Sequence, residues 1–221
     1  MNVRLISHSQ TAENLYVGDN LQELVAYSAR VSNPSNQLNS ETSERLLAYL
    51  IKHRHWSPFE MVSACLEIET TRDIARQILR HRSFSFQEFS QRYADPTQDL
   101  EINELREARL QDQKNRQNSI VTDDVDLQLE WYTKQAEVIA AAKNSYAWAI
   151  ENGIAKEQAR AVLPEGTTKS RLYMNGTIRS WMHYIEIRSG IETQKEHREV
   201  ALACADALEP IFPMIKEFKH V

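Results

Sequence analysis

The pattern of apolar and polar residues predicts the elements of the first part of the chain. A short strand is expected around residues 3–6, and apolar residues at helical spacing extend over 21–31 and over about 41–53. From residue 62 the period changes to two, so 62–69 forms the clearest strand in the sequence. The helix expected next has an apolar face made of Ile74, Ala75, Ile78 and Leu79.

The rest of the chain predicts a polar excursion followed by helices. Residues 97–126 are polar, with helix-forming sequence around 104–113, and we expect them to lie on the surface. A long amphipathic helix is expected over 127–150, ending at Asn152-Gly153. Further helices are expected over 156–163, 177–188 and about 193–208. Without an internal repeat, these elements predict one α+β domain over residues 1–221.

Composition and charge narrow the class of protein. The chain has 221 residues, 42% of them hydrophobic and 26% charged, which suits a domain with a sizeable core. The formal net charge of −5 disfavours nucleic acid as a partner, so an anion site must be local. No apolar segment approaches the roughly 20 residues that span a bilayer, and no targeting segment precedes the first strand. We therefore expect a cytoplasmic protein without a membrane partner.

A run of arginines, serines and aromatic residues carries the candidate chemistry. It extends from Arg80 to Tyr93, with the sequence Arg-His-Arg-Ser-Phe-Ser-Phe-Gln-Glu-Phe-Ser-Gln-Arg-Tyr. Arginine forks bind phosphate oxygens bidentately, hydroxyl groups add hydrogen bonds, and a carboxylate such as Glu88 accepts from a ribose hydroxyl. A solvated basic loop is the plainest alternative, and single-stranded nucleic acid is another. The helix before the run adds Arg72 and Arg76, which four-residue spacing places on one face with Arg80.

Glycine and cysteine usage constrain any nucleotide site further. The five glycines are too dispersed to form a phosphate-binding glycine loop, so side chains must hold the phosphates. The two cysteines, Cys65 and Cys204, stand among apolar residues that keep thiols protonated. We interpret both as small core residues rather than nucleophiles, and we expect no metal site, because His53 and His55 have no carboxylate or thiol cluster beside them.

Four blocks together are similar to the flavin-dependent thymidylate synthase family. Arg80-His-Arg, seven further residues and Ser90 resemble the family signature, and the likeness continues through Gln-Arg-Tyr93. His53-Arg-His-Trp-Ser-Pro-Phe-Glu60 resembles the block before it. Ala159-Arg-Ala-Val-Leu-Pro164 and Thr177-Ile-Arg-Ser-Trp-Met-His-Tyr-Ile-Glu-Ile-Arg188 resemble the two blocks after it. The blocks occur in the family's order, and the resemblance covers most of residues 1–215.

The resemblance implies two sets of binding residues and one catalytic residue. The residues expected around dUMP are Gln77, Ile78, Leu79, Arg80, Glu88, Phe89, Ser90, Gln91, Arg92, Arg160 and Arg188. The residues expected to approach FAD are Ser57, Arg80, His81, Arg82, Glu88, Thr177, Ile178, Arg179 and His183. Arg188 would lie beside the uracil ring as the catalytic residue, because a guanidinium stabilises the charge that develops when N3 loses its proton.

The resemblance also implies a reaction and an assembly. NADPH would reduce FAD, 5,10-methylenetetrahydrofolate would donate its carbon to C5 of dUMP, and the reduced flavin would supply the hydride, without a cysteine nucleophile. The implied fold is a twisted, mainly antiparallel sheet wrapped by helices, in a homotetramer whose active sites are shared between subunits. The chain departs from the family's common residues at Met61, His183 and Glu192.

Two other functions are compatible with the arginine cluster. A nucleotide- or RNA-binding regulatory protein would keep the arginines without performing chemistry. A flavin oxidase or reductase would oxidise NADPH without responding to dUMP. A flavin absorption band would count against the first of these, and a response of NADPH oxidation to dUMP would count against the second.

Overall fold

A four-stranded antiparallel sheet forms the centre of the molecule. The computed structural model describes residues 1–12, 15, 17–18, 20–100 and 102–220, so residue 101 of the predicted excursion lies outside it. The strand order is β1-β2-β6-β3, and each neighbouring pair is antiparallel. The strands are β1 (Asn2–His8), β2 (Ser63–Thr71), β3 (Ser85–Glu88) and β6 (Lys169–Thr177). The α+β class and the antiparallel sheet that the sequence and its resemblance indicated are confirmed.

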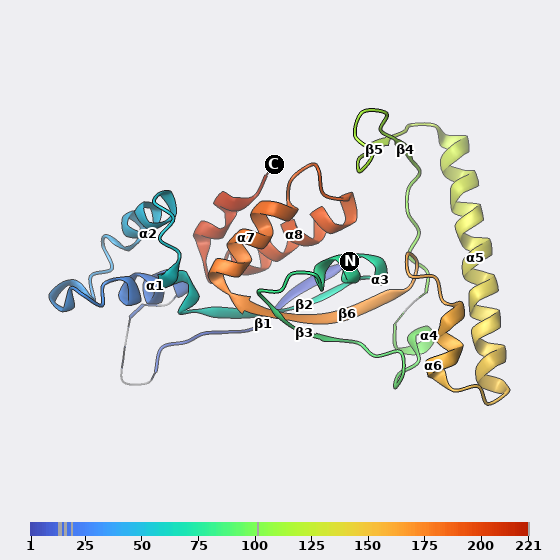
Figure 1. Cartoon of the computed structure of the whole chain (residues 1–221), viewed down its shortest axis with the longest axis horizontal. Helices are drawn as coiled ribbons and strands as arrows, with labels where there is room; N and C mark the ends of the chain where they lie inside the picture. Colours follow the sequence, from blue (N-terminus) through green and yellow to red (C-terminus); the bar gives the residue numbers. More distant parts are fainter. Residues whose placement is uncertain (13–14, 16, 19, 101, 221) are drawn as a thin grey trace.

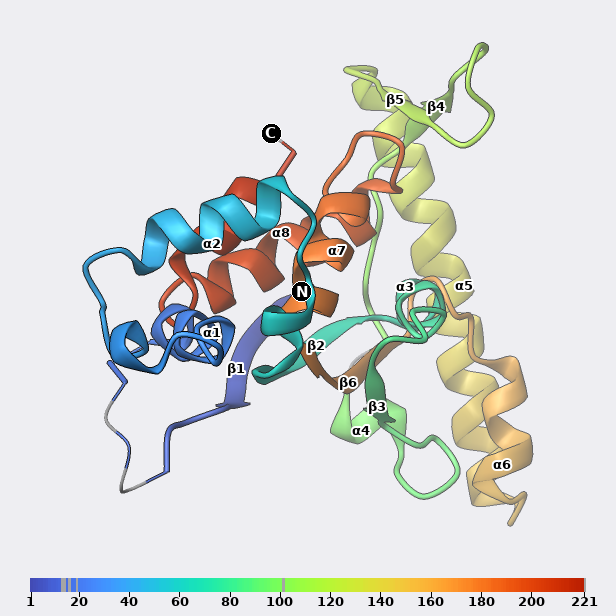
Figure 2. The same cartoon turned by 60° about the vertical axis from the view of Figure 1, so that its left-hand side comes forward.

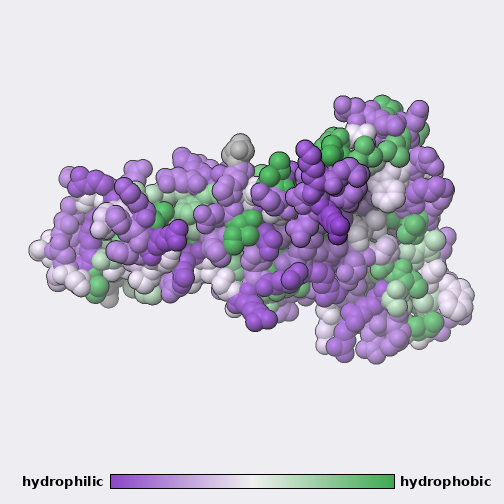
Figure 3. All heavy atoms as spheres, turned by 45° about the horizontal axis from the view of Figure 1, so that its top comes forward, coloured by the Kyte–Doolittle hydropathy of each residue, from purple (hydrophilic) through white to green (hydrophobic). Residues whose placement is uncertain are grey.

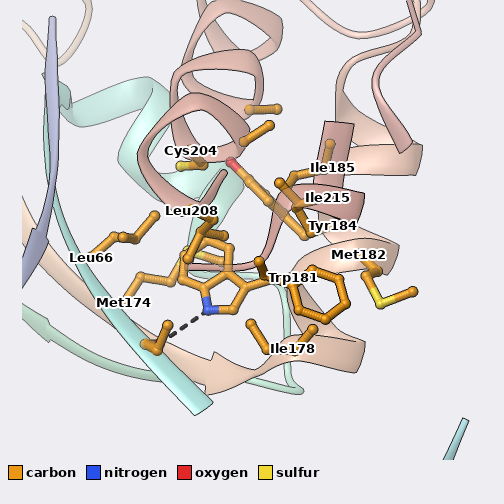
Figure 4. Close-up of a cluster of buried hydrophobic side chains, with 14 of the residues drawn as sticks. Leu66, Met174, Ile178, Trp181, Met182, Tyr184, Ile185, Cys204, Leu208 and Ile215 are labelled. Carbon is orange, nitrogen blue, oxygen red and sulfur yellow. Dashed lines mark hydrogen bonds between the residues drawn. The ribbon is translucent and has the colours of Figure 1, made fainter. Parts of the chain in front are cut away.

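Helices α7 (Ile178–Arg188) and α8 (Lys195–Leu208) cover one face of this sheet (Figure 1). The core between them contains fully buried residues of β2 and β6, such as Leu66, Ile68 and Met174, together with Trp181. Trp181 donates its indole N–H to the carbonyl oxygen of Ala64 at 3.0 Å, and Figure 4 shows it at the centre of this core. Because α7 starts directly after β6, the sheet fixes where Arg188, at the other end of α7, is placed.

The remaining helices lie at the two ends of the molecule (Figures 1 and 2). One end contains α1 (Leu21–Ala29) and α2 (Ser43–Lys52), and the other contains the 27-residue α5 (Val125–Glu151) with α6 (Lys156–Ala159). The shorter helices are α3 (Arg72–Ile78), α4 (Pro96–Asp99) and the 3₁₀ helices η1 (Pro34–Asn36), η2 (Ser57–Glu60), η3 (Arg160–Val162) and η4 (Pro213–Phe218). Among the described residues no helix is both long and apolar enough to cross a bilayer.

The excursion departs from its predicted structure. Residues 104–113 form no helix, because Arg109–Gln111 (β4) pairs with Ser119–Val121 (β5) in a small antiparallel hairpin. The hairpin lies near the start of α5 (Figure 2). The prediction of a helix at 104–113 was therefore wrong: Leu110 and its neighbours pair with a strand that follows a turn, and single-segment propensity does not report such pairing.

The arginines of α3 also depart from their predicted arrangement. The helix ends at Ile78, so Arg80 lies beyond it and does not continue the face of Arg72 and Arg76. Arg72 and Arg76 both approach Glu165, at 3.9 Å and 3.3 Å, and Arg72 also lies 3.6 Å from Glu88. Two of the three guanidinium groups are thus compensated by carboxylates, and only Arg80 remains available at the end of the helix.

Candidate functional site

A cavity of about 800 Å³ collects much of the predicted chemistry. It lies where the end of α3, the start of the arginine run, α7 and the loop before α8 meet. The residues that line it are Gln77, Arg80, His81, Arg82, Ser83, Gln117, His183, Arg188, Glu192, Thr193 and Gln194. The structure therefore brings together two of the motif blocks, which are separated by about a hundred residues in sequence.

Arg188 is held at this cavity by His81. Its Nε donates a hydrogen bond to Nε2 of His81 at 2.9 Å, and the side chain is half-buried. Burial lowers the pKa of His81 to about 4, with the neighbouring Arg188, His183 and Arg80 charges adding to the effect. His81 is therefore neutral at pH 7 and can accept from Arg188. With Nε engaged, the two terminal amino groups of the guanidinium remain for a ligand.

The arginines that line the cavity carry positive charges that are not paired with carboxylates within the described part of the chain. Arg80, Arg82 and Arg188 all line it, and among the described residues none of them forms an ion pair with Asp or Glu. Three such guanidinium groups repel one another unless an anion lies between them. In a chain with a net charge of −5, this local excess of positive charge indicates an anionic ligand.

A second cavity of about 350 Å³ adjoins the first and shares Ser83 and His183 with it. Its other lining residues include Trp56, Glu60, Arg179, Met182 and Glu186. Arg179 forms an ion pair with Glu60 from the block that precedes β2. The exposed Ser57 lies next to Trp56 in that block, so several residues expected to approach FAD gather here.

Two other residues of the predicted FAD set stabilise the fold. Thr177 is the N-cap of α7, and its side-chain oxygen accepts from the backbone N–H of Ser180 at 3.3 Å. Ile178 is fully buried in the core. Only the backbone of Ile178 could therefore contact a ligand.

The predicted dUMP residues of α3 divide in the same way. Gln77 lines the cavity, whereas Ile78 is fully buried and Leu79 is the C-cap of the helix. The side chain of Ile78 therefore packs in the core beneath the cavity, and any contact of Ile78 with a ligand must come from its backbone.

The rest of the predicted dUMP set forms a separate cluster outside the cavity. Glu88 accepts from the Ser170 hydroxyl at 2.8 Å and lies near Arg72. Arg92 lies 3.6 Å from Glu157, whose backbone carbonyl accepts from Nε of Arg160 at 3.2 Å. This second cluster consists of Glu88, Phe89, Ser90, Gln91, Arg92 and Arg160. Within one chain it does not meet Arg188 around the same cavity.

One residue of the second cluster is left incompletely bonded. Gln91 is buried, with 4% of its surface exposed, and its amide nitrogen has no hydrogen-bond partner. An unpaired buried amide costs about 1–3 kcal/mol, so this position favours an additional acceptor.

Several lining residues were not among the predicted sites. Gln117 comes from the turn of the β4–β5 hairpin, and Ser83, Thr193 and Gln194 come from loops. Ser83 lies inside the run from Arg80 to Tyr93, but Gln117, Thr193 and Gln194 belong to no residue type or spacing that marks a nucleotide site, so sequence reasoning had no signal for these three. Of the three departures from the family's residues, His183 and Glu192 line the cavity, whereas Met61 is exposed outside it.

The described residues contain no group of three or more His, Cys, Asp or Glu side chains that could hold a metal ion. The two cysteines are separate from the cavity. Cys204 is a fully buried residue of α8, and Cys65 is partly exposed on β2. Burial raises the pKa of both thiols, as the sequence indicated, although Cys65 is not the fully buried core residue that we predicted.

Comparison with known proteins shows which family the chain resembles over most of its length. The family described as thymidylate synthase complementing protein matches residues 14–214. A protein of Paramecium bursaria Chlorella virus 1, called a probable flavin-dependent thymidylate synthase, is 51% identical over 194 residues, with 88% of each chain covered. The flavin-dependent thymidylate synthase of Synechocystis is 48% identical over 219 residues, with 97% of each chain covered.

Solved structures agree in fold. The UMP/dUMP methylase PolB from Streptomyces cacaoi bound with 5-Br UMP is similar with a TM-score of 0.78 and 25% identity, covering 98% of this chain and 92% of that one. The same enzyme bound with 5-Br dUMP gives a TM-score of 0.75 and 27% identity, with 98% and 93% covered. Because the family match covers most of the chain and the relatives are 48–51% identical to it, the chain belongs to the family of flavin-dependent thymidylate synthases.

Proposed function

We propose that the protein is a flavin-dependent thymidylate synthase that converts dUMP to dTMP. 5,10-Methylenetetrahydrofolate would donate the carbon, and NADPH would provide the reducing equivalents through FAD. The observation that carries the proposal is a cavity of about 800 Å³ lined by three guanidinium groups that have no carboxylate partner in the described part of the chain. Relatives that are 48–51% identical to this chain are called flavin-dependent thymidylate synthases, and this supports the proposal.

The donor set of the site fits FAD. The glycine-poor chain has no phosphate-binding loop, so side chains such as Arg80 and Arg82 must meet the pyrophosphate. Each of the two adjoining cavities is within the size range of ligand and cofactor sites. When bound, FAD would supply the hydride that completes the methyl group. Ser57, Arg179 and His183 would then hold the part of the cofactor that extends into the second cavity.

Arg188 would activate the pyrimidine. An uncharged uracil is a poor nucleophile at C5, but loss of the N3 proton raises the electron density of the ring. A guanidinium beside N3 and its flanking carbonyl groups stabilises the resulting negative charge. The bond from Nε to His81 holds the plane of Arg188, so its two terminal amino groups are oriented before the nucleotide arrives. No protein nucleophile is then required.

We propose that the second cluster reaches the cavity of a neighbouring subunit in a homotetramer. Arg92 is exposed and Arg160 is half-buried, so both can reach beyond their own chain, and Gln91 has an unpaired amide nitrogen. The helix α5 exposes large apolar side chains, including Leu129 and Trp148, and Figure 3 shows apolar residues over this end of the molecule. An assembly that covers α5 would bury these residues and let two subunits share one active site.

Residues 1–221 would act as one domain of a cytoplasmic enzyme. The rival functions make different predictions for purified protein. We expect a yellow protein with a flavin absorption band, and NADPH oxidation that depends on dUMP and methylenetetrahydrofolate and yields dTMP. A colourless protein that binds nucleotides would support a regulatory role, whereas NADPH oxidation unaffected by dUMP would support a flavin oxidase or reductase.

Replacing both cysteines should leave catalysis intact. In a Cys65→Ser, Cys204→Ala variant we expect dTMP formation within about threefold of the wild-type rate, because both thiols are protonated and neither lines the cavity. The small void left at Cys204 should lower the free energy of unfolding by about 1 kcal/mol. The rate is compared per flavin bound. A variant that is folded and flavin-loaded but inactive would refute the thiol-free mechanism.

A further inference from the structure

A chain of hydrogen bonds connects the cavity to the β4–β5 hairpin. The Tyr184 hydroxyl lies 3.1 Å from Nε2 of His197, and Nδ1 of His197 lies 3.1 Å from Oε1 of Gln77. Nε2 of Gln77 donates to Oε1 of Gln194 at 2.8 Å. Nε2 of Gln194 donates to Glu196 at 2.9 Å, and the other oxygen of Glu196 accepts from Arg109 of β4. This series of hydrogen bonds therefore links the buried Tyr184 and His197, the cavity and the excursion.

The carboxylate at one end of this chain determines the direction of every bond. An ionised carboxylate only accepts, so Gln194 must turn its NH₂ group to Glu196 and its oxygen to Gln77. Gln77 must then turn its NH₂ group to Gln194 and its oxygen to His197. Consequently the proton of neutral His197 lies on Nδ1, and Nε2 accepts from the Tyr184 hydroxyl.

The surroundings maintain both ends of the chain. Burial alone would raise the pKa of Glu196, but a backbone N–H, Gln194 and the Arg109 charge outweigh it and lower that pKa. Glu196 therefore stays ionised at neutral pH. Burial lowers the pKa of His197 to about 3, with Arg188 and His81 adding to the effect, so its ring stays neutral. Because Tyr184 and His197 are both fully buried, water cannot replace either partner.

Gln77 has one N–H left over after these bonds are made. The NH₂ group of Gln77 bonds to Gln194, which lines the cavity. The oxygen of Gln77 bonds to His197, which is fully buried and does not line the cavity. The NH₂ end of Gln77 is therefore the end nearer the cavity. In this orientation the residue offers a donor, which suits a carbonyl oxygen of uracil. The reverse orientation would offer an acceptor, which suits the amino group of cytosine.

We propose that Glu196, held by Arg109 of the hairpin, sets the Gln77 amide as a donor and thereby makes the site prefer uracil over cytosine nucleotides. Glu196, Gln194 and His197 are positioning residues that act through Gln77. The inference rests on the proposed function, because it assumes that a pyrimidine nucleotide occupies the cavity. It also gives the excursion a role, since Arg109 supports the active site from β4.

The sharpest variant is Glu196→Gln. Its amide oxygen would face Arg109, so its NH₂ group would face Gln194 and reverse every bond in the chain. The proton of His197 would move from Nδ1 to Nε2. The binding preference for dUMP over dCMP should fall about tenfold, as expected for one hydrogen bond. Glu199→Gln is the matched control, because it removes the same charge from an exposed position on the same helix.

Two measurements on the FAD-loaded protein test this inference. Nitrogen NMR of ¹⁵N-histidine protein reports the tautomer of His197, and titration with dUMP and dCMP reports the preference. We expect Nδ1–H in the wild type and in Glu199→Gln, and Nε2–H with reduced preference in Glu196→Gln. Nε2–H in the wild type, or a Glu196→Gln protein with unchanged preference, would overturn the inference.

The two proposals fail in distinguishable ways. Wild-type protein that binds neither nucleotide would contradict the proposed function and remove the nucleotide that the inference requires, even if His197 carried its proton on Nδ1. Wild-type protein that makes dTMP but has His197 protonated on Nε2 would contradict the inference alone. If Glu196→Gln does not fold, the wild-type tautomer still decides the direction of the chain.

Discussion

Replacing Arg188 with alanine is expected to lower the rate of dTMP formation by about a thousandfold while FAD remains bound. A charge-stabilising donor that acts on the reacting group typically contributes two to three orders of magnitude to the rate. Arg188 also has no carboxylate partner among the described residues, so its removal leaves no buried charge unpaired. Turnover is measured with saturating dUMP, and flavin content is measured from absorbance.

Two further variants make the Arg188 result specific. Arg188→Lys keeps a positive charge but loses the planar donor that Nε offers to His81, so we expect it to recover only a small part of the rate. Arg45→Ala removes an exposed arginine of α2 outside the cavity and should leave turnover unchanged. Near-normal turnover in Arg188→Ala would contradict the activating role.

Replacing Trp181 with alanine is expected to lower the free energy of unfolding by about 3–5 kcal/mol. The indole is fully buried at the centre of the core (Figure 4) and donates to the Ala64 carbonyl. Its ring centroid lies 4.8 Å from that of Phe84, in an edge-on arrangement. Its loss leaves a cavity between α7 and the sheet and removes the side-chain hydrogen bond to the Ala64 carbonyl. Denaturant unfolding of the flavin-free protein measures the effect.

Trp181→Phe provides the graded comparison. It keeps most of the buried volume but removes the indole N–H, so we expect a loss of about 1–3 kcal/mol from the lost hydrogen bond to the Ala64 carbonyl and the smaller ring. The order of stability should be wild type, then Trp181→Phe, then Trp181→Ala. If alanine cost less than about 1 kcal/mol, the proposed dependence of α7 on this contact would be wrong.

Where apolar residues recur with a clear helical or strand period, the sequence was sufficient to place the helices and strands. The strand predicted at 62–69 is β2 (Ser63–Thr71), and the helix predicted at 127–150 is α5 (Val125–Glu151). The helix predicted at 177–188 is α7, with Thr177 as its N-cap. These segments have clear caps or unbroken apolar alternation, so local patterns alone define them.

The central strand β6 was not predicted, for a physical reason. Its inward positions alternate correctly, but two of them are Ser170 and Gly176, which dilute the apolar signal. Gly176 is required there, because a Cβ would lie 2.4 Å from the ring of Phe84. The packing of the Phe84 ring against Gly176 thus excludes the β-branched residue that a strand prediction relies on.

The candidate site was predictable in part. Arginine spacing and the motif blocks led to Arg80, His81 and Arg188, which the structure places around one cavity. Gln117 and Gln194 could not be found in this way, because a hairpin and a loop bring them to the cavity through tertiary contacts. Nor could the sequence indicate that Arg160 belongs to a separate cluster within the chain.

The most direct test of the proposed function is release of tritium from dUMP labelled at C5. The new carbon displaces the hydrogen of C5, so label enters water only if that carbon reacts. With NADPH and methylenetetrahydrofolate present, we expect FAD-loaded protein to release tritium in step with dTMP formation and FAD-free protein to release none. FAD-loaded protein that binds dUMP but releases no tritium and forms no dTMP would contradict the account.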